Sequence, residues 1–203
     1  LFYFGQNEKK HLKFSSLPSL LKEGDILVKN RSKVIPARVE GKKDTGGKVE
    51  ILFYQRVNNG WKCLIKGSNL KVGRKLFVED NQLDIIEDGI GGRFILKCNN
   101  AEELMQKYGT MPTPPYIKEE IDSPSDYQTI YAEENGSVAA PTAGFHFTKD
   151  ILTELRNKGV GIYDIILHVG PGTFLPVRDE DIEKHKMGKE YYEVNEETAH
   201  AVT

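Results

Sequence analysis

The stretch GSVAAPTAGFHFTKDILTELRNKGVGIYDIILHVGPGTFLPV, residues 136–177, decides the fold. Thr148 can cap a helix that runs through Lys158, and Gly159 ends the helical pattern. Residues 162–169 form an almost continuous apolar run, which is typical of a strand with both faces covered in a parallel sheet. Loop, helix and strand in this order predict an α/β unit.

Two loops that flank this unit each place a histidine beside small residues. His146 precedes the helix N-terminus, where the helix dipole favours a neutral imidazole, and His168 ends the apolar strand. In α/β sheets the carboxyl ends of the strands form the crevice that binds ligands. We therefore expect a ligand site with His146 and His168 as acid–base groups. The alternative for His146, a ring bonded only to its own turn, has equal weight.

Further side chains are candidates for holding a ligand. Gly170 and Gly172 allow close approach of the backbone and Thr173 adds a hydroxyl. The other substrate-binding candidates are Pro141, Thr142, Gly144, Tyr116, Gln128 and Arg178. Three of them have a structural alternative: the tyrosine packs on the neighbouring prolines, the glutamine bonds to backbone, and the arginine is a solvated surface group.

Several kinds of site are absent from the sequence. The glycine loop matches neither G-x-G-x-x-G nor a phosphate loop, and there is no G-x-S-x-G elbow. The two histidines lie on different elements without a cysteine or paired carboxylates at ligand spacing, so we expect no metal and no resident cofactor. Cys63 and Cys98 each alternate with apolar residues, which predicts buried, reduced thiols.

Short strands with turn signals between them occupy the interval from Arg38 to Cys98. This pattern favours a small β-barrel, and Asn59-Gly60 indicates a hairpin whose two central residues have positive φ. Asn100 is then positioned to cap a helix over residues 101–108 that ends at Gly109. The expected strands are 48–54, 61–66, 75–78, 82–86 and 93–98.

Charge divides unevenly along the 203 residues. Residues 1–100 carry 19 basic and 11 acidic side chains, whereas residues 101–203 carry 9 and 19. The basic half is suited to a phosphate backbone, although solvation of exposed strands is the simpler explanation. The candidate RNA-binding residues are Lys42, Lys43, Lys62, Lys66, Arg74 and Lys75.

The hydropathy of the chain and its two ends predict its location and whether it is complete. No apolar run approaches the length that crosses a bilayer, and no signal pattern opens the chain, so we expect a cytoplasmic protein. We also expect a monomer. The chain begins without methionine and stops within a helical pattern, which predicts that both ends are cut.

Several motifs, in register along nearly the whole chain, resemble the S-adenosylmethionine:tRNA ribosyltransferase-isomerase family of queuosine biosynthesis. The resemblance covers NRSKVIPAR (30–38), GKKDTGGKVEIL (41–52), YGTMPTPPYIK (108–118), DYQTIYA (126–132), the two histidine loops and HKM…YYEV (185–194). It departs from the family at Arg31-Ser32-Lys33, where Asp/Asn-Thr-Arg is usual, and at Gly188-Lys189, where His-Ser is usual, so the latter segment inherits no catalytic role.

The resemblance implies a fold, a reaction and substrates. The fold is an α/β domain, here residues 1–37 and 101–203, with a β-barrel domain inserted at residues 38–100. The reaction transfers the ribosyl unit of S-adenosylmethionine to the 7-aminomethyl-7-deazaguanine of tRNA and rearranges it, giving epoxyqueuosine-tRNA, adenine and methionine. S-adenosylmethionine is thus a substrate, tRNA is the partner, and the chain corresponds to a fragment because the family extends beyond both ends.

Two rival functions belong to other classes. A non-catalytic RNA-binding module would hold tRNA without releasing adenine, and its two loops would only stabilise turns. A hydrolase or nucleotide-binding enzyme with an unfamiliar loop would turn over without tRNA.

Overall fold

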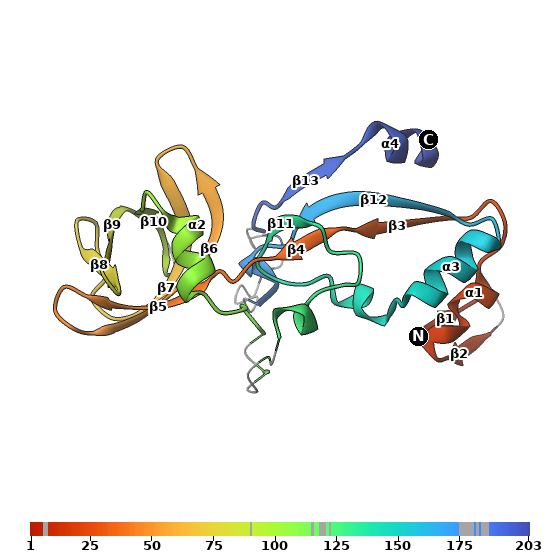
Figure 1. Ribbon diagram of the computed structural model, residues 1–203, viewed down its shortest axis with the longest axis horizontal. Helices are drawn as coiled ribbons and strands as arrows, with labels where there is room; N and C mark the ends of the chain where they lie inside the picture. The colour runs from red at the N-terminus through yellow and green to blue at the C-terminus, as the bar shows by residue number, and fades with distance from the viewer. Residues whose placement is uncertain are drawn as a thin grey trace.

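The computed structural model describes residues 1–5, 8–89, 91–114, 116–117, 121, 123–174, 181, 183 and 187–203. The molecule has two lobes, a β-barrel and an α/β lobe, and both chain ends lie in the α/β lobe (Figure 1). The predicted fold class, an α/β domain with an inserted antiparallel barrel, is confirmed.

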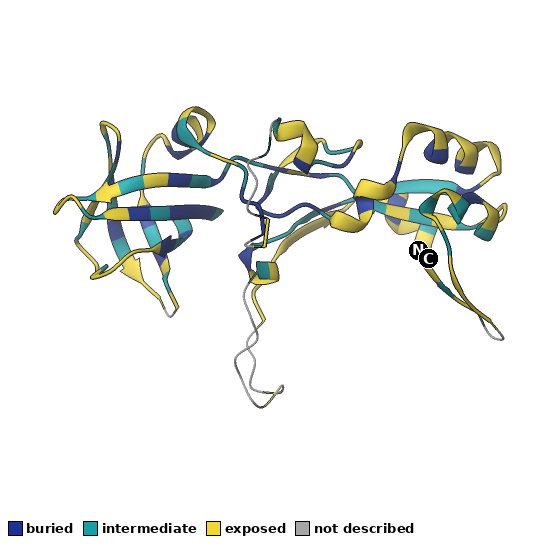
Figure 2. Ribbon diagram, turned by 90° about the horizontal axis from the view of Figure 1, so that it is seen from below, coloured by how far each residue is buried: buried dark blue, intermediate teal, exposed yellow. Residues whose placement is uncertain are grey.

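The barrel is a closed ring of six antiparallel strands in the order β10-β7-β6-β5-β8-β9. Buried residues alternate with more exposed ones along most of these strands, as an inward and an outward face require (Figure 2). The longest strand is an exception, since Ile51, Leu52 and Phe53 are buried in succession. The strand that comes first in the chain, β5, was not among those expected, because only Val39 of its sequence RVEGKK is buried and apolar. The strands are β5 (Arg38–Lys43), β6 (Lys48–Val57), β7 (Gly60–Lys66), β8 (Lys75–Val78), β9 (Asn81–Asp88) and β10 (Arg93–Lys97).

The hairpin between β6 and β7 is confirmed, but its turn differs from the prediction. Val57 pairs with Gly60, so Asn58 and Asn59 form the loop. Gly60 has φ +155°, whereas Asn59 is not in the positive-φ region. A Cβ on Gly60 would lie 2.2 Å from the carbonyl oxygen of Leu96. The glycine is therefore required by close approach to β10.

Helix α2 (Ala101–Tyr108) has the predicted bounds and buries Ala101, Leu104 and Met105 in the barrel core. The predicted cap is wrong, since the Asn100 side chain makes no capping bond and its Nδ2 donates to Asn81 Oδ1 at 2.9 Å. Gly109 ends the helix with φ −82°; a Cβ there would lie 1.8 Å from the Pro36 carbonyl oxygen. Steric contact, not a left-handed backbone, thus calls for glycine at this position.

The α/β lobe contains a three-stranded sheet in the order β13-β12-β3. β12 (Gly161–His168) pairs parallel with β3 (Ile26–Asn30) and antiparallel with β13 (Tyr191–Val194). Helix α3 (Lys149–Asn157) precedes β12, and Thr148 Oγ1 accepts the Ile151 N–H at 3.2 Å, which confirms the predicted cap.

The prediction that β12 is covered on both faces is wrong. Of its residues only Ile166 is buried, and the others are half-buried. Side chains of the flanking strands are 40–70% exposed, namely Ile26, Val28, Tyr192 and Val194. The core of this lobe is instead the cluster formed by α3 and its neighbours, which contains Ile151, Leu152 and Leu155.

Short elements complete the molecule. β4 and β11 pair in parallel between the lobes, and none of the helices in the described residues is long and apolar enough to cross a membrane. These elements are β1 (Phe2–Phe4), β2 (Lys9–His11), α1 (Leu17–Leu20), β4 (Ser32–Val34), β11 (Glu134–Ser137), α4 (Glu196–Val202) and the 3₁₀ turns η1 (Phe14–Ser16), η2 (Pro124–Tyr127), η3 (Thr142–His146) and η4 (Pro171–Phe174).

Candidate functional site

A cleft lies where the barrel meets the α/β lobe. It consists of two adjoining cavities of about 460 and 530 Å³, and both are lined by Trp61 of β7, Glu102 of α2 and Gly136 of β11. Tyr54 of β6 and Tyr191 of β13 line the first cavity. We refer to the two cavities together as the interlobe cleft.

His168 reaches the interlobe cleft because it is the last residue of β12. Its register partner on β13 is Tyr191, whose ring stacks on the imidazole with centroids 5.5 Å apart and planes 22° from parallel. On the other side, Ser32 Oγ lies 2.7 Å from His168 Nδ1. Burial lowers the pKa of His168, an effect that the Glu134 carboxylate opposes. The lowered pKa favours the neutral form of the ring.

Asn30 aligns the ends of β3 and β12 beside this histidine. Its Nδ2 donates to the Leu167 carbonyl at 2.8 Å, and its Oδ1 accepts the Leu167 N–H at 3.0 Å. The same Oδ1 accepts the Ser32 N–H at 3.0 Å. One amide side chain thus fixes both the strand that carries Ser32 and the strand that carries His168.

Gly136 packs against the opposite edge of the imidazole. A Cβ at this position would lie 2.5 Å from His168 Nε2, and the residue has φ +150°. Sequence reasoning missed the roles of Ser32, Gly136 and Tyr191. Ser32 precedes His168 by 136 positions, and no local pattern links residues so far apart.

The predicted glycine loop is only partly at the cleft. Gly170 lines it, and its N–H donates to Glu190 Oε1 at 2.7 Å. Gly172 and Thr173 are exposed on η4 and do not line the interlobe cleft. A Cβ on Gly172 would meet no atom of the described residues within 4 Å, so contact with them does not require glycine there.

The structure does not bring His146 to the same cleft as His168. His146 is exposed on η3, and its ring packs on Phe14 with centroids 5.2 Å apart. Pro141 and Gly144 close this turn through a 2.7 Å backbone bond, and Thr142 is exposed. A Cβ on Gly144 would lie 2.4 Å from the Tyr131 hydroxyl. The turn therefore packs against Tyr131, and Pro141, Thr142 and Gly144 are not among the residues that line the interlobe cleft.

The remaining ligand candidates lie in different surroundings. Gln128 lines the second cavity, but its amide already clamps β4: Oε1 accepts the Val34 N–H at 3.0 Å and Nε2 donates to the Val34 carbonyl at 2.8 Å. Tyr116 is 79% exposed. Arg178 lies outside the described residues.

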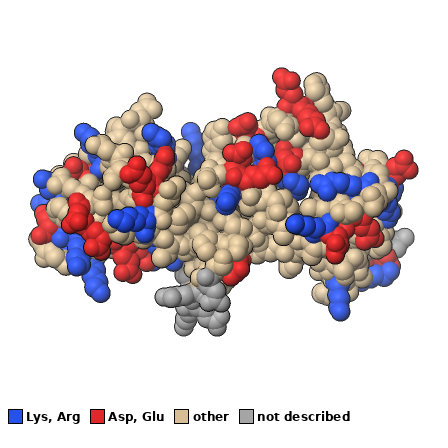
Figure 3. Space-filling model, viewed as in Figure 1, with Lys and Arg blue, Asp and Glu red and all other residues tan. Residues whose placement is uncertain are grey.

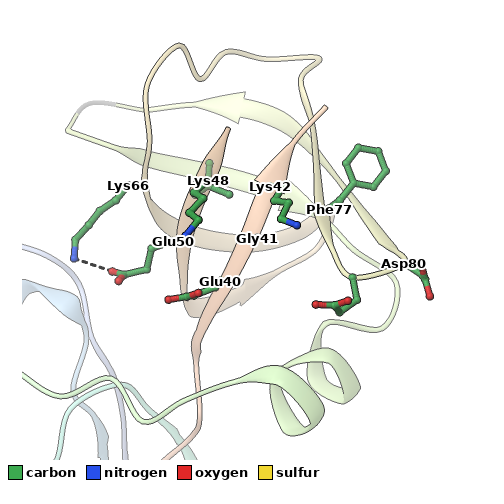
Figure 4. Close-up of a pocket in the computed structure, with 10 residues that line it drawn as sticks. Glu40, Gly41, Lys42, Lys48, Glu50, Lys66, Phe77 and Asp80 are labelled. Carbon is green, nitrogen blue, oxygen red and sulfur yellow. Dashed lines mark ion pairs between the residues drawn. The ribbon is translucent and has the colours of Figure 1, made fainter. Parts of the chain in front are cut away.

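Basic and acidic side chains are interspersed on the face of the barrel shown in Figure 3. Lys66 pairs with Glu50 at 2.7 Å and Arg74 with Asp44 at 2.9 Å. Lys42 and Lys66 line a cavity of about 450 Å³ that also contains several carboxylates (Figure 4). Of the other candidates, Lys43 bonds to Ser68, Lys62 bonds to Gln55, and Lys75 is exposed.

Both predicted thiols are free. Cys63 is buried in the barrel core, and burial raises its pKa well above the ordinary value. Cys98 is half-buried, and burial raises its pKa as well. Neither sulfur lines the cavity that contains His168.

Fold and cleft together define a two-lobed α/β protein with an inserted barrel and a strand-end histidine at the junction of its lobes. The family model described as queuosine biosynthesis protein matches residues 1–203. The chain therefore belongs to the queuosine biosynthesis protein family.

Curated relatives agree in name over most of this chain. The protein of Thermosipho melanesiensis, named S-adenosylmethionine:tRNA ribosyltransferase-isomerase, is 47% identical over 98% of the chain and 60% of its own length. The protein of that name from Fusobacterium nucleatum is 45% identical over 94% of the chain and 56% of its own length. The chain thus spans about 60% of the length of these relatives.

A solved structure is also similar in sequence. The crystal structure of S-adenosylmethionine tRNA ribosyltransferase from Thermotoga maritima is 28% identical, covers 96% of this chain and 53% of its own, and superposes with a TM-score of 0.33.

Proposed function

We propose that this chain acts as an S-adenosylmethionine:tRNA ribosyltransferase-isomerase. It would transfer the ribosyl unit of S-adenosylmethionine to 7-aminomethyl-7-deazaguanine in tRNA and isomerise it, with release of adenine and methionine. The observation that carries this proposal is the family match over all 203 residues, together with relatives of that name at 45–47% identity. The proposal includes a cytoplasmic monomer for which S-adenosylmethionine is a substrate.

The size and the aromatic lining of the interlobe cleft are suited to a planar ligand. Its cavities of about 460 and 530 Å³ fall in the range of ~300–1,000 Å³ typical of small-molecule sites. The rings of Tyr54 and Trp61 on the barrel side, and of Tyr191 on the other, are suited to stacking on heterocycles. We therefore propose that a base or the adenine of the donor enters this cleft beside His168.

The reaction makes demands that this cleft can meet in part. It requires removal of a proton from the carbon next to the sulfonium, stabilisation of charge on the departing adenine, and exclusion of water from the opened sugar. Among the histidines of the described residues, His168 lines the interlobe cleft and is the candidate for these roles. Exposed barrel lysines such as Lys42 and Lys75 remain proposed contacts to the tRNA backbone.

Adenine release tests the proposal directly. The chain is incubated with S-adenosylmethionine and tRNA that carries the precursor base, and adenine and the modified nucleoside are followed by chromatography and mass spectrometry. We expect His168→Gln to lower the rate by about 10²–10³-fold, because the cleft loses a hydrogen-bond donor that can stabilise developing charge. His200→Gln, on the exposed face of α4, is the matched control and leaves the rate unchanged.

Each rival function predicts another result. Tight tRNA binding without adenine release, at all concentrations of donor, contradicts the proposal and supports a non-catalytic RNA-binding module. Consumption of donor in the absence of tRNA supports a hydrolase.

A further inference from the structure

The hydrogen bond between Ser32 and His168 determines which nitrogen of the ring carries the proton. Ser32 is 1% exposed, and its Oγ lies 2.7 Å from Nδ1. Among the described residues, no other hydrogen bond involves this hydroxyl. A buried hydroxyl needs an acceptor for its proton, and a bare imidazole nitrogen is one. Ser32 is therefore the donor, and Nδ1 is the unprotonated nitrogen.

We infer that Ser32 holds His168 as the neutral Nε2–H tautomer, so that the ring serves the interlobe cleft as a hydrogen-bond donor rather than as a general base. Ser32 is then a positioning residue, because it acts through His168. The role toward a ligand rests on the proposed function, whereas the tautomer does not. A neutral imidazole can stabilise developing charge by donating a hydrogen bond without transferring its proton.

Because Gly136 has no side chain, space remains beside the donor nitrogen. A Cβ there would lie 2.5 Å from Nε2 and 2.7 Å from Cε1, so any side chain would cover that edge of the ring. Gly136 and His168 line the same cavity. The group that meets Nε2–H is accordingly an acceptor, such as a ring nitrogen or a carbonyl oxygen of a heterocycle that fits between the aromatic walls.

The charged groups around the ring are consistent with a neutral donor. Burial disfavours the imidazolium, and the opposing charge is Glu134 on β11. Tyr191 stacks on the ring rather than bonding to its nitrogens. The other charged groups that line this cavity are Arg56, Glu102, Lys189 and Glu190. Among the described residues, none of them forms a hydrogen bond with His168.

Nitrogen NMR of the ligand-free chain tests the tautomer. In long-range ¹H–¹⁵N spectra at pH 7.5, the His168 signals are identified by their absence in His168→Gln. We expect Nδ1 to resonate as a bare nitrogen and Nε2 as a protonated one. The opposite assignment, or rapid exchange between the two tautomers, overturns the inference.

Variants of Ser32 extend the test to function. Ser32→Ala is expected to mix the tautomers and lower kcat about tenfold with little change in KM, because one neutral hydrogen bond is lost. Ser32→Thr keeps the hydroxyl and is expected to restore both the nitrogen shifts and kcat. Failure of Ser32→Thr to restore the shifts in a folded protein contradicts a positioning role.

The two claims fail separately. The nitrogen shifts need no ligand, so a wrong tautomer overturns this inference alone, whereas absence of adenine release overturns the proposed function alone. If Ser32→Ala does not fold, the wild-type spectrum still decides the tautomer.

Discussion

The barrel and the α/β lobe differ in whether their sheets have edge strands: the barrel is closed, whereas the sheet of the α/β lobe is open. Every barrel strand has two neighbours, and Phe53, Leu76 and Leu83 in its core are completely buried. The three-stranded sheet of the α/β lobe ends at β3 and β13, where apolar side chains remain exposed. The histidine of the cleft therefore belongs to the less covered lobe, and Tyr54 and Trp61 of the barrel line the same cavity.

Truncation of the barrel core should have the largest effect. Phe53→Ala is expected to lower the free energy of unfolding by about 3–5 kcal/mol, since the side chain is fully buried and leaves a cavity. Urea denaturation measures the loss, and hydrogen exchange assigns it to the barrel. Leu155→Ala, equally buried in α3, is the counterpart and should reduce protection chiefly in the α/β lobe. Equal loss of protection in both lobes would show that they unfold as one unit.

Overpacking beside Tyr131 should have the next largest effect. Gly144→Ala places a Cβ 2.4 Å from the Tyr131 hydroxyl and 2.6 Å from Thr129 Cγ2. We expect a loss of about 1–3 kcal/mol, because the turn must move to admit a methyl group. Gly188→Ala is the matched control, as its Cβ would meet no atom within 4 Å in the part of the chain that the structure describes. Unchanged stability of Gly144→Ala would show that the turn is loosely packed.

Acidification should weaken the α/β lobe through His168. Because burial lowers the folded pKa, the unfolded chain binds more protons near pH 6. The contribution of His168 to stability is therefore present above about pH 6.5 and is lost as pH falls through the folded pKa. The urea midpoint should fall more between pH 7.5 and 5.5 for the wild type than for His168→Gln. A larger fall for His168→Gln would reverse the assigned sign.

The surface ion pair between β6 and α2 should contribute least. Arg56 and Glu102 meet at 3.1 Å, but their side chains are 73% and 63% exposed. A double-mutant cycle with Arg56→Gln and Glu102→Gln is expected to give a coupling below about 1 kcal/mol. A coupling of several kcal/mol would mean that charge, rather than packing of Leu104 and Met105, holds α2 on the barrel.

Local patterns in the sequence predicted much of the fold. Short runs separated by turn signals located five barrel strands, and the Thr148 cap located α3, because both signals depend on near neighbours. β5 was missed since its outward face is charged, and the Asn100 cap failed since the β9–β10 side of the barrel offered that amide another partner in Asn81. How the chain divides into domains remains a prediction.

The candidate site was less predictable than the fold. His168 was identified from its place at a strand end, but its partners come from β4, β11 and β13, which only the folded chain brings together. His146 shares the same kind of sequence context, and the structure nevertheless packs it on Phe14. The catalytic roles of both histidines remain predictions.

The chain enters the barrel at Arg38 and leaves it at Thr110, and these two residues exchange backbone hydrogen bonds of 3.2 and 2.8 Å. The barrel thus interrupts the sequence of the α/β lobe, but the two ends of that interruption lie side by side. A short turn that joins residues 37 and 111 would close the gap, and the excised barrel would have adjacent ends suited to circular permutation. Acquisition or loss of the barrel would therefore require no rearrangement of the lobe that carries His168.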